Sequence, residues 1–409
     1  MNIKKLIKQF NLHDLRFYPL WELTVWNRKF KGVDNKKQQE IFRYRGVSAK
    51  VLKELENLSG DVRLLSTGNY DSYTTSHKAS DYLYEGEIIT IPSGGRANIK
   101  YHKGKFVSSG NYIVTSADIS LLSNKFLYYY LLSINKLIQG FYRGPNIQHP
   151  EMRQILKIKI PVPVLSIQQE IVDILDKFTE LEAELEAELE AELEARKKQY
   201  EYYRNQLLTF DSSEGGGRWF TLGDIVDFKN GKSHEKNISL TGRYIVVNSK
   251  FVSTVGQGVK KFVVQQICPV YAGDILLVMS DLPNGRALAK CFYVAENNKY
   301  SLNQRVCALS TKDSKKIDSK YLFYVLDRNR QFLKYNDGSN QTNLSKSNIL
   351  KIKIFIPLMD KQKSIIYILD KFQSLINDIS EGLPAELEAH RKQYEYYRDK
   401  LLTFEKAKV

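Results

Sequence analysis

The chain has 409 residues, of which 61 are Lys or Arg and 46 are Asp or Glu, so its formal net charge is +15. Its length exceeds one typical domain, and a hydrophobic fraction of 43% allows sizeable cores. The charge favours a polyanionic partner, nucleic acid before a membrane surface, over a merely basic soluble protein. Because no apolar run has the length of a membrane span and no secretory signal opens the chain, we expect a cytoplasmic location without membrane contact.

Residues 1–163 have the pattern of a mixed α/β domain. GEIITIPSG, from Gly86, and YIVTSAD, from Tyr112, are apolar runs bounded by turn residues, which is typical of buried strands. NKFLYYYLLSINKLI, from Asn124, has apolar residues at helical spacing. ILKIKIPVPV, from Ile155, alternates at period two and ends in prolines, which predicts an edge strand leaving its sheet.

Two segments of this domain, SGGRANIKYHKGK and YRGPNIQH, combine glycine with basic and amide side chains. Arg and Lys bind phosphates, Arg, Lys, Asn and Gln read base edges, and glycine allows close backbone approach. We therefore predict DNA contacts here, although an ordinary polar loop explains each residue equally well. The candidates are Ser93, Arg96, Lys100, His102, Lys103, Tyr142, Arg143, Asn146 and Gln148.

Residues 164–210 predict one long helix, because apolar side chains recur at three- and four-residue steps. Inside it, a Glu-Leu-Glu-Ala unit is repeated head to tail from Glu180 to Ala195. One more unit would lengthen the helix by about 6 Å and rotate the residues after it by about 40°. A protein that reads two separated DNA sites could retune their spacing this way. A low-complexity tract of good helix formers is the plainer explanation.

Residues 211–357 predict a second mixed α/β domain. GDILLVMSD, ALAKCFYVA and RVCALST have strand character, and SKYLFYVLDRNRQFL has helical spacing. The segments NGRA and DGSNQTNLSKS are the DNA-contacting candidates, although Asn and Gln of the latter could instead cap the following helix. The candidate residues are Asn284, Arg286, Ser339, Asn340, Gln341, Thr342 and Lys346.

Residues 358–409 repeat the long helix, with Gly382 and Pro384 predicting a kink or short break inside it. ILDKF, ILKIKI and KQYEYYR each occur twice, and the two copies are separated by 194 residues in every case. Three matches in one register indicate an internal duplication. Upstream of these blocks the halves diverge, so variable domains alternate with constant helices. Two equal helices can bury their apolar stripes by packing antiparallel.

At this point the sequence resembles the specificity subunits of type I DNA restriction-modification systems. The resemblance covers nearly the whole chain and rests on IPVPVLSIQQEIVDILDKF and KIFIPLMDKQKSIIYILDKF, on SNQTNLSKSNILKIKI and on the tetrapeptide tract, which resembles the spacer repeats of that family. The first half departs from the pattern, with GPNIQHPEMRQILKIKI before its helix. We therefore expect that loop to differ, and we do not transfer base contacts between the halves.

The resemblance implies an α+β fold: two mixed α/β target-recognition domains separated by two long antiparallel helices related by an internal pseudo-twofold. Each domain would read one half of a split double-stranded DNA target. The helices would set the spacing and dock two methyltransferase subunits, and restriction-translocase subunits would join the complex. The candidate partner-binding residues are Gln168, Phe178, Tyr200, Tyr203, Gln362, Phe372, Tyr394 and Tyr397.

The sequence lacks the usual marks of catalysis. It has no Pro-Pro of an adenine methyltransferase motif, no Pro-Asp of a common nuclease signature, and its six histidines are scattered. Its three cysteines lack zinc-site spacing, so we expect buried thiols and no metal or cofactor. Two alternatives stay open: a coiled-coil scaffold whose charge serves only solubility, and a solitary nuclease or methyltransferase with a degenerate motif.

Overall fold

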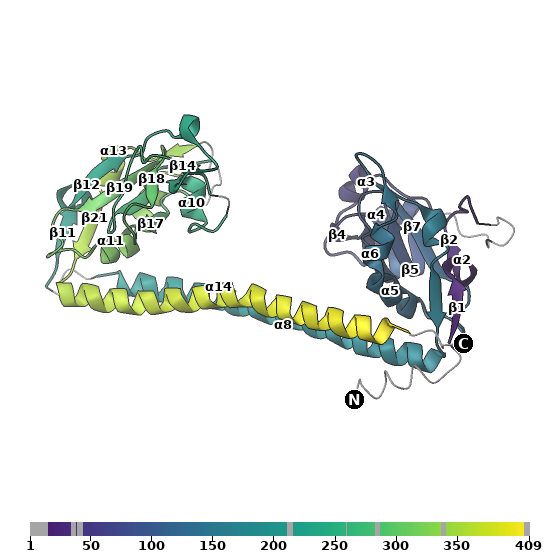
Figure 1. Ribbon diagram of the computed structural model, residues 1–409. Coiled ribbons are helices and arrows are strands. Elements are labelled where there is room, and N and C mark those ends of the chain that lie inside the picture. The colour runs from purple at the N-terminus through teal and green to yellow at the C-terminus, as the bar shows by residue number, and fades with distance from the viewer. Residues whose placement is uncertain are drawn as a thin grey trace. The chain divides into compact units, whose positions relative to one another are not determined.

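The computed structural model describes residues 15–33, 38, 44–210, 216–258, 260–282, 287–336 and 341–404. The chain divides into two compact units (Figure 1). Unit 1 comprises Met1–Leu189 and Leu383–Val409, and unit 2 comprises Glu190–Gly382. Each unit therefore holds one α/β domain together with a part of both long helices.

Unit 1 is built on a six-stranded mixed sheet with the strand order β2-β7-β5-β6-β3-β4. β5 pairs antiparallel with β6 and β7, whereas β3 and β6 are parallel. The strands predicted from Gly86 and Tyr112 are β5 and β7. The sheet consists of β2 (Thr24–Trp26), β3 (Val62–Leu65), β4 (Asp71–Thr74), β5 (Tyr84–Pro92), β6 (Lys100–Ser108) and β7 (Asn111–Ser116).

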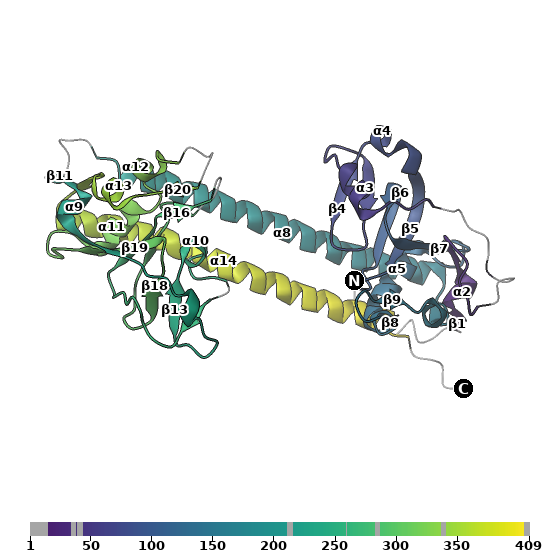
Figure 2. The same cartoon turned by 90° about the horizontal axis from the view of Figure 1, so that it is seen from above.

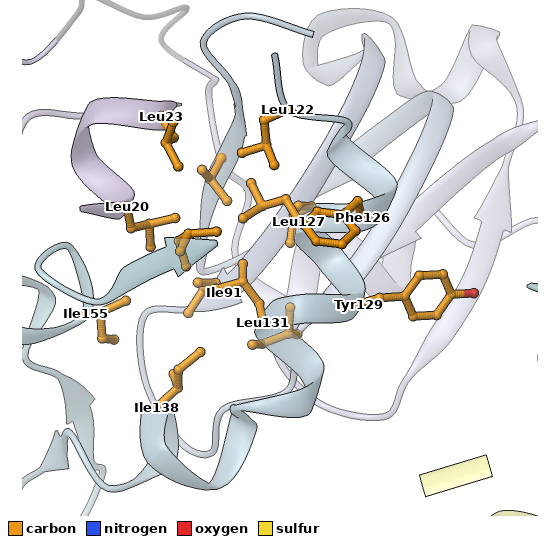
Figure 3. Packing of buried hydrophobic residues seen from close by; sticks show 14 of the residues in the cluster. Leu20, Leu23, Ile91, Leu122, Phe126, Leu127, Tyr129, Leu131, Ile138 and Ile155 are labelled. Carbon is orange, nitrogen blue, oxygen red and sulfur yellow. The ribbon is translucent and has the colours of Figure 1, made fainter. Parts of the chain in front are cut away.

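The predicted helical segment of this domain forms two consecutive helices, α5 (Asn124–Ser133) and α6 (Asn135–Gln139). Phe126, Leu127 and Leu131 of α5 point into the main core of unit 1, where they meet Ile91 of β5 (Figure 3). The ring of Tyr129 points away from the other labelled side chains, with its hydroxyl outermost (Figure 3). The remaining short helices are α2 (Leu20–Leu23), α3 (Ala49–Glu54), α4 (Ser76–Ala79), η1 (Ser80–Tyr82) and α7 (Met152–Ile155).

Unit 2 splits its strands between a four-stranded sheet, β12-β19-β15-β17, and a three-stranded sheet, β14-β13-β18. The predicted strand segments supply β15, β17 and β19. The strands are β12 (Val226–Asn230), β13 (Tyr244–Val247), β14 (Phe262–Val263), β15 (Ile275–Val278), β17 (Cys291–Tyr293), β18 (Tyr300–Leu302) and β19 (Val306–Thr311). The short helices are α9 (Leu222–Ile225), η2 (Glu235–Asn237), α10 (Ser249–Ser253), α11 (Ser319–Leu326), α12 (Arg330–Leu333) and α13 (Lys346–Leu350).

A two-stranded antiparallel ribbon precedes each long helix. In unit 1, β1 (Arg16–Pro19) pairs with β10 (Lys159–Val162), and in unit 2, β11 (Arg218–Thr221) pairs with β21 (Lys353–Ile356). β10 and β21 are 194 residues apart and have one partner each, as expected for an edge strand that runs out into a proline. Each of the two divergent domains thus ends in the same arrangement, a two-stranded ribbon followed by a long helix.

The two long helices are α8 (Leu165–Leu207) and α14 (Met359–Leu402). α14 runs through Gly382 and Pro384 as one helix, so the predicted short break is wrong, and the alternative of a kink stays a prediction. Pro384 removes one backbone donor, and the neighbouring turns hold the helix across that gap. In Figure 2 the helices run side by side within each unit.

The helices are antiparallel inside each unit. In unit 1, Phe178 stacks on Tyr397, and Glu182, further along α8, forms an ion pair with Arg391, which lies earlier on α14. Each helix also ends in a hydrophobic core. Leu401 and Leu402 of α14 are buried in the core of unit 1, and Leu207 and Leu208 pack against the core of unit 2.

Within the described ranges, no helix combines the length and apolarity required to cross a bilayer. The three cysteines, Cys268, Cys291 and Cys307, are free thiols and are buried in unit 2, as predicted. Burial raises the pKa of the Cys291 and Cys307 thiols well above the usual value. These thiols are therefore poor nucleophiles in the folded chain.

Candidate nucleic-acid interface

The two predicted DNA-contacting segments of the first domain meet at one end of its sheet. One is the loop from Ser93 to Ile99, which joins β5 to β6. The other is the hairpin of β8 (Tyr142–Arg143) and β9 (His149–Pro150). The Gly95 amide donates to the Gln148 carbonyl over 2.8 Å, and the His149 Nδ1 lies 2.7 Å from the Ser93 carbonyl oxygen. Segments more than 40 residues apart in sequence therefore form one surface.

The exposed residues of this surface have the chemistry of a DNA reader. Arg96, Arg143, Asn146 and Gln148 are all exposed. The Arg143 guanidinium donates to the Tyr142 carbonyl over 3.0 Å, so the hairpin backbone orients it. Ser93 is partly buried, and its hydroxyl donates to the Gly110 carbonyl over 2.6 Å, which fixes the loop against the neighbouring turn.

Among the other candidates of this domain, Tyr142 needs correction. It is only 2% exposed and donates its phenol to the Pro92 carbonyl, so its side chain belongs to the core. Lys100, His102 and Lys103 lie on strand β6, opposite residues 87–90 of β5, rather than in the loop, and their contact with DNA stays a prediction. Lys100 donates to the Tyr70 carbonyl, and His102 bonds the Lys105 carbonyl. The loop ends earlier than the glycine pattern indicated, because β-sheet pairing continues through this basic stretch.

A polar cleft beside the loops contains residues that the sequence analysis missed. Arg28, Asn111, Tyr112 and His149 line it, and the Arg28 guanidinium lies over the Tyr112 ring at 5.4 Å. The segment WNRKFKG, with basic residues between aromatic ones just after β2, is the signal that could have indicated it. A cation held over an aromatic ring next to glycine turns suits a phosphate or a base.

In the second domain, the two candidate segments flank one short ladder. β16 (Ser280–Asp281) pairs antiparallel with β20 (Thr342–Asn343). The side chain of Gln341, which is exposed, donates to the Ser280 hydroxyl over 2.8 Å. The loop therefore differs from that of the first domain, as expected, because β9 pairs with β8 whereas β20 pairs with β16.

The other candidates of the second domain differ in exposure. Thr342 is 9% exposed and donates to Asn336, so its side chain is not available to DNA, which corrects that prediction. Lys346 is exposed at the start of α13, with its ammonium 5.3 Å from the Phe228 ring. Ser345 caps this helix, so the Asn and Gln side chains before it are not needed as caps. The candidates Asn284, Arg286, Ser339 and Asn340 lie outside the described residues.

Gln168 and Gln362, predicted as partner contacts, are fully buried. The Gln168 side chain accepts from the Ser123 amide and donates to the Leu121 and Pro163 carbonyls, at 2.8, 2.8 and 2.7 Å. Gln362 makes the equivalent set with residues 318, 316 and 357. These glutamines fasten each helix to its own domain, which corrects their assignment as a docking surface.

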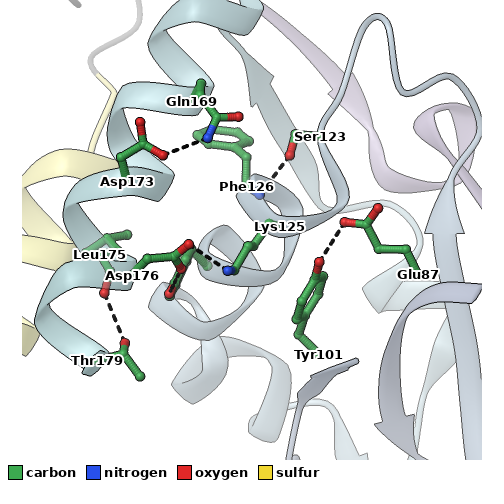
Figure 4. A network of polar contacts seen from close by, with 11 residues as sticks. Glu87, Tyr101, Ser123, Lys125, Phe126, Gln169, Asp173, Leu175, Asp176 and Thr179 are labelled. Atoms are coloured by element: carbon green, nitrogen blue, oxygen red, sulfur yellow. Dashed lines mark hydrogen bonds and ion pairs between the residues drawn. The ribbon is translucent and has the colours of Figure 1, made fainter. Parts of the chain in front are cut away.

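A second fastening lies about two turns after the glutamine on each helix. Asp176 accepts from the Lys125 ammonium and the Tyr129 phenol, both at 2.6 Å (Figure 4). Asp370 binds Lys320 at 2.7 Å and Tyr324 in the same way. Burial and the carboxylate raise the pKa of the Tyr129 and Tyr324 phenols far above their ordinary value. Both phenols therefore act as permanent donors.

The predicted aromatic residues of the helices pack mainly within the protein. Phe178 stacks on Tyr397 with ring centres 5.5 Å apart, and Phe372 stacks on Tyr203 at 5.2 Å. Burial raises the pKa of both Tyr200 and Tyr394 to about 12. Among these aromatic residues only Tyr203 is exposed, at 40%, and the others are partly buried.

The more exposed apolar side chains were missed, and they recur at the 194-residue spacing. Val164, Leu181 and Tyr202 are each more than half exposed, and so are Leu358 and Tyr396, while Leu375 is 49% exposed. The pairs 164 and 358, 181 and 375, and 202 and 396 are equivalent under the duplication. A search for apolar residues off the buried stripe that recur in both copies would have found them. The helical frame thus exposes the same apolar set twice.

The chain contains two divergent α/β domains, each followed by a copy of the same long helix. This defines a modular class of protein, in which the helices are alike and the domain loops differ. A family model described as the type I restriction modification DNA specificity domain matches residues 31–195 and again 218–389. The chain belongs to this family.

Two similar proteins match this chain in sequence over most of their length. A putative type I restriction enzyme specificity subunit from Haemophilus influenzae is 31% identical over 391 residues, covering 91% of this chain and 96% of that protein. The type I restriction enzyme EcoR124I/EcoR124II specificity subunit of Escherichia coli is 33% identical over 364 residues, covering 82% and 80%.

Solved structures agree with the fold. A chain from work on complex assembly and conformational transition of the type I R-M system covers 95% of this chain and 97% of its own length, with a TM-score of 0.64 and 14% identity. The HsdS subunit from Thermoanaerobacter tengcongensis covers 95% and 96%, with a TM-score of 0.51 and 14% identity. At this identity the likeness supports the fold alone.

Proposed function

We propose that this chain is the non-catalytic DNA-reading subunit of a type I restriction-modification complex in the cytoplasm. Each α/β domain reads one half of a split double-stranded target. The long helices set the gap between the halves and dock two methyltransferase subunits, and restriction-translocase subunits complete the assembly. Reading is assigned to the exposed loops, and docking to the recurring apolar residues of the helices.

One observation carries this proposal: the two halves of the chain share the contacts between domain and helix, and they differ in the loops at the domain tips. The glutamine and aspartate fastenings recur at both domains with the same partners. The loops at the domain tips differ in sequence and in strand pairing. A protein that keeps its partners while changing its DNA target requires this division, because docking must be preserved while base contacts change.

The exposed apolar residues that recur in both copies of the helix support two copies of one partner. Unit 1 contains Leu181 and Tyr396, and unit 2 contains their equivalents, Leu375 and Tyr202. Tyrosine and leucine exposed in this way are typical of an interface. Because the two sets are equivalent in the repeat, one partner surface fits both.

The decisive experiment maps methylated bases in host DNA with and without the gene. We expect one split motif that disappears with the gene and returns with it. Loss of the gene without loss of any motif, or methylation of the same sites by the methyltransferase partner alone, would refute the proposal. Salt-sensitive, sequence-selective DNA binding by the complex excludes the scaffold alternative. Activity of the isolated chain with magnesium or a methyl donor would instead support a solitary enzyme.

A further inference from the structure

His149 stands at the edge of the polar cleft in the first domain. The cleft is lined by Arg28, Ser93, Asn111 and Tyr112, and His149 is exposed beside them. His149 is the first residue of the two-residue strand β9, so its ring lies next to the turn of the hairpin that carries Arg143 and Gln148. It therefore belongs to the surface assigned to DNA reading, on which this inference depends.

The tautomer of this ring is fixed by its surroundings. Nδ1 lies 2.7 Å from the Ser93 carbonyl oxygen, and a carbonyl can only accept. In the neutral ring, Nδ1 must therefore carry the hydrogen, and Nε2 presents a lone pair. Among the described residues, none bonds Nε2 of His149. The protein thus offers one oriented acceptor at the domain tip.

The loop beneath the ring is rigidly held. The Ser93 amide and hydroxyl both donate to the Gly110 carbonyl, at 2.9 and 2.6 Å. Gly94 leaves room for the ring, because a Cβ there would lie 3.2 Å from the Cε1 of His149 and 3.2 Å from a methyl of Ile147. This contact is tighter than most, so a side chain at position 94 would push the imidazole out of place.

We propose that His149 is a specificity-determining residue that accepts a hydrogen bond from an exocyclic amino group in the DNA target. In the major groove only adenine and cytosine present such a donor, through N6 and N4. Guanine and thymine present acceptors there, which the Nε2 lone pair repels. The first domain therefore selects an amino-bearing base on the strand that His149 faces.

The second domain has a different group at the equivalent place. Asn343 follows His149 by 194 residues, is exposed, and lies in the short strand before the short helix of its domain, as His149 does. Its amide offers a donor as well as an acceptor. The two domains thus differ in hydrogen-bonding pattern at one matched position, and Asn343 provides the control for His149.

The test uses the complete complex in cells and methylation mapping. We expect His149→Leu to relax one base pair in one half-site, with a loss of discrimination of roughly two- to ten-fold, as one hydrogen bond provides. Gly94→Ala should relax the same position, and Asn343→Leu should change only the other half-site. The exposed position of His149 predicts that complex recovery stays unchanged.

A second measurement addresses the amino group directly. Binding of the purified complex to a duplex whose base at that position lacks its exocyclic amino group should weaken for the wild type and stay unchanged for His149→Leu. An unaltered motif in the His149→Leu complex, or relaxation confined to the half-site that Asn343→Leu changes, overturns the inference and leaves the proposed function intact. A wild-type complex that adds no split motif overturns both.

Discussion

Gln168 and Gln362 show what one buried amide does for each helix. Each has a buried side chain that satisfies one backbone donor and two backbone acceptors. We expect Gln168→Leu to destabilise unit 1 by about 2–4 kcal/mol, because the buried Pro163 carbonyl and the part-buried Ser123 and Leu121 backbone groups lose their partners. Gln169→Leu is the control, since Gln169 is exposed and bonds only Asp173. Denaturant unfolding compares them, and equal midpoints would contradict the assignment.

Tyr200 and Tyr394 make the stability of the helices depend on alkaline pH. Burial raises the pKa of each to about 12, whereas an unfolded tyrosine titrates near 10. A raised folded pKa means that the stabilising contribution is complete below pH of about 10 and is lost as pH rises toward 12. Tyr200→Phe should flatten this loss in unit 2. Unfolding followed at several alkaline pH values measures the slope, and an unchanged slope would contradict the prediction.

At the residue scale, the sequence indicated which kinds of side chain lie in the exposed turns better than it indicated where each side chain points. Arg96, Arg143, Asn146 and Gln148 are exposed, as glycine and amide side chains in a turn indicate, and their contact with DNA stays a prediction. Tyr142 was misassigned because a tyrosine in a polar loop can turn its ring inward and keep only its hydroxyl bonded. Arg28 was missed because its cleft is completed by a segment more than 80 residues away in the chain.

At the element scale, each long helix is as important at its last turn as at its first. Leu401 and Leu402 are buried in the core of unit 1, although nearly 200 residues separate them from α8. Leu401→Ala should therefore destabilise unit 1 by about 2–5 kcal/mol, the usual cost of a cavity at a closed core position. Leu207→Ala should cost less, in unit 2, because Leu207 is only partly buried.

Truncation separates this effect from a general shortening of the chain. A chain that ends at Phe404 retains Leu401, Leu402 and the edge contact of Phe404 with Phe126. A chain that ends at Lys400 loses all of them. Hydrogen exchange should accelerate in α5 only for the shorter chain. Equal exchange in both chains would show that the C-terminal turn does not stabilise the first domain.

The elements themselves were largely predictable, because the long helices and the strands have strong periodicity. What periodicity could not show is that α8 has no fully buried side chain beyond Leu175. The Glu-Leu-Glu-Ala tract repeats every four residues, whereas the helix turns every 3.6, so its leucines drift off the packing face. The predicted short break at Pro384 was wrong, since α14 continues through this residue even though proline removes one backbone donor.

At the scale of the whole molecule, the duplication fixes a length. Phe178 and Tyr203 are 25 residues apart on α8, and Phe372 and Tyr397 are 25 residues apart on α14. The stacked pairs join 178 to 397 and 203 to 372, so the two helices supply equal lengths between them. Between these two contacts, the Glu-Leu-Glu-Ala tract therefore gives α8 no more residues than α14 has, and only its composition is repetitive.

Because the two helices have equal lengths between these contacts, an insertion in one helix can be compared with matched insertions in both. Inserting one Leu-Glu-Ala-Glu unit in the α8 tract lengthens that helix by about 6 Å, or at most about two base pairs of duplex. We expect the methylation map to show a wider gap with both half-sites unchanged. α14 contains one Glu-Leu-Glu-Ala unit, residues 386–389, so a matched four-residue insertion there restores equal lengths. The doubly inserted chain should show the same wider gap and a higher melting temperature than the singly inserted one. An unchanged gap in both would mean that the helices do not set the spacing.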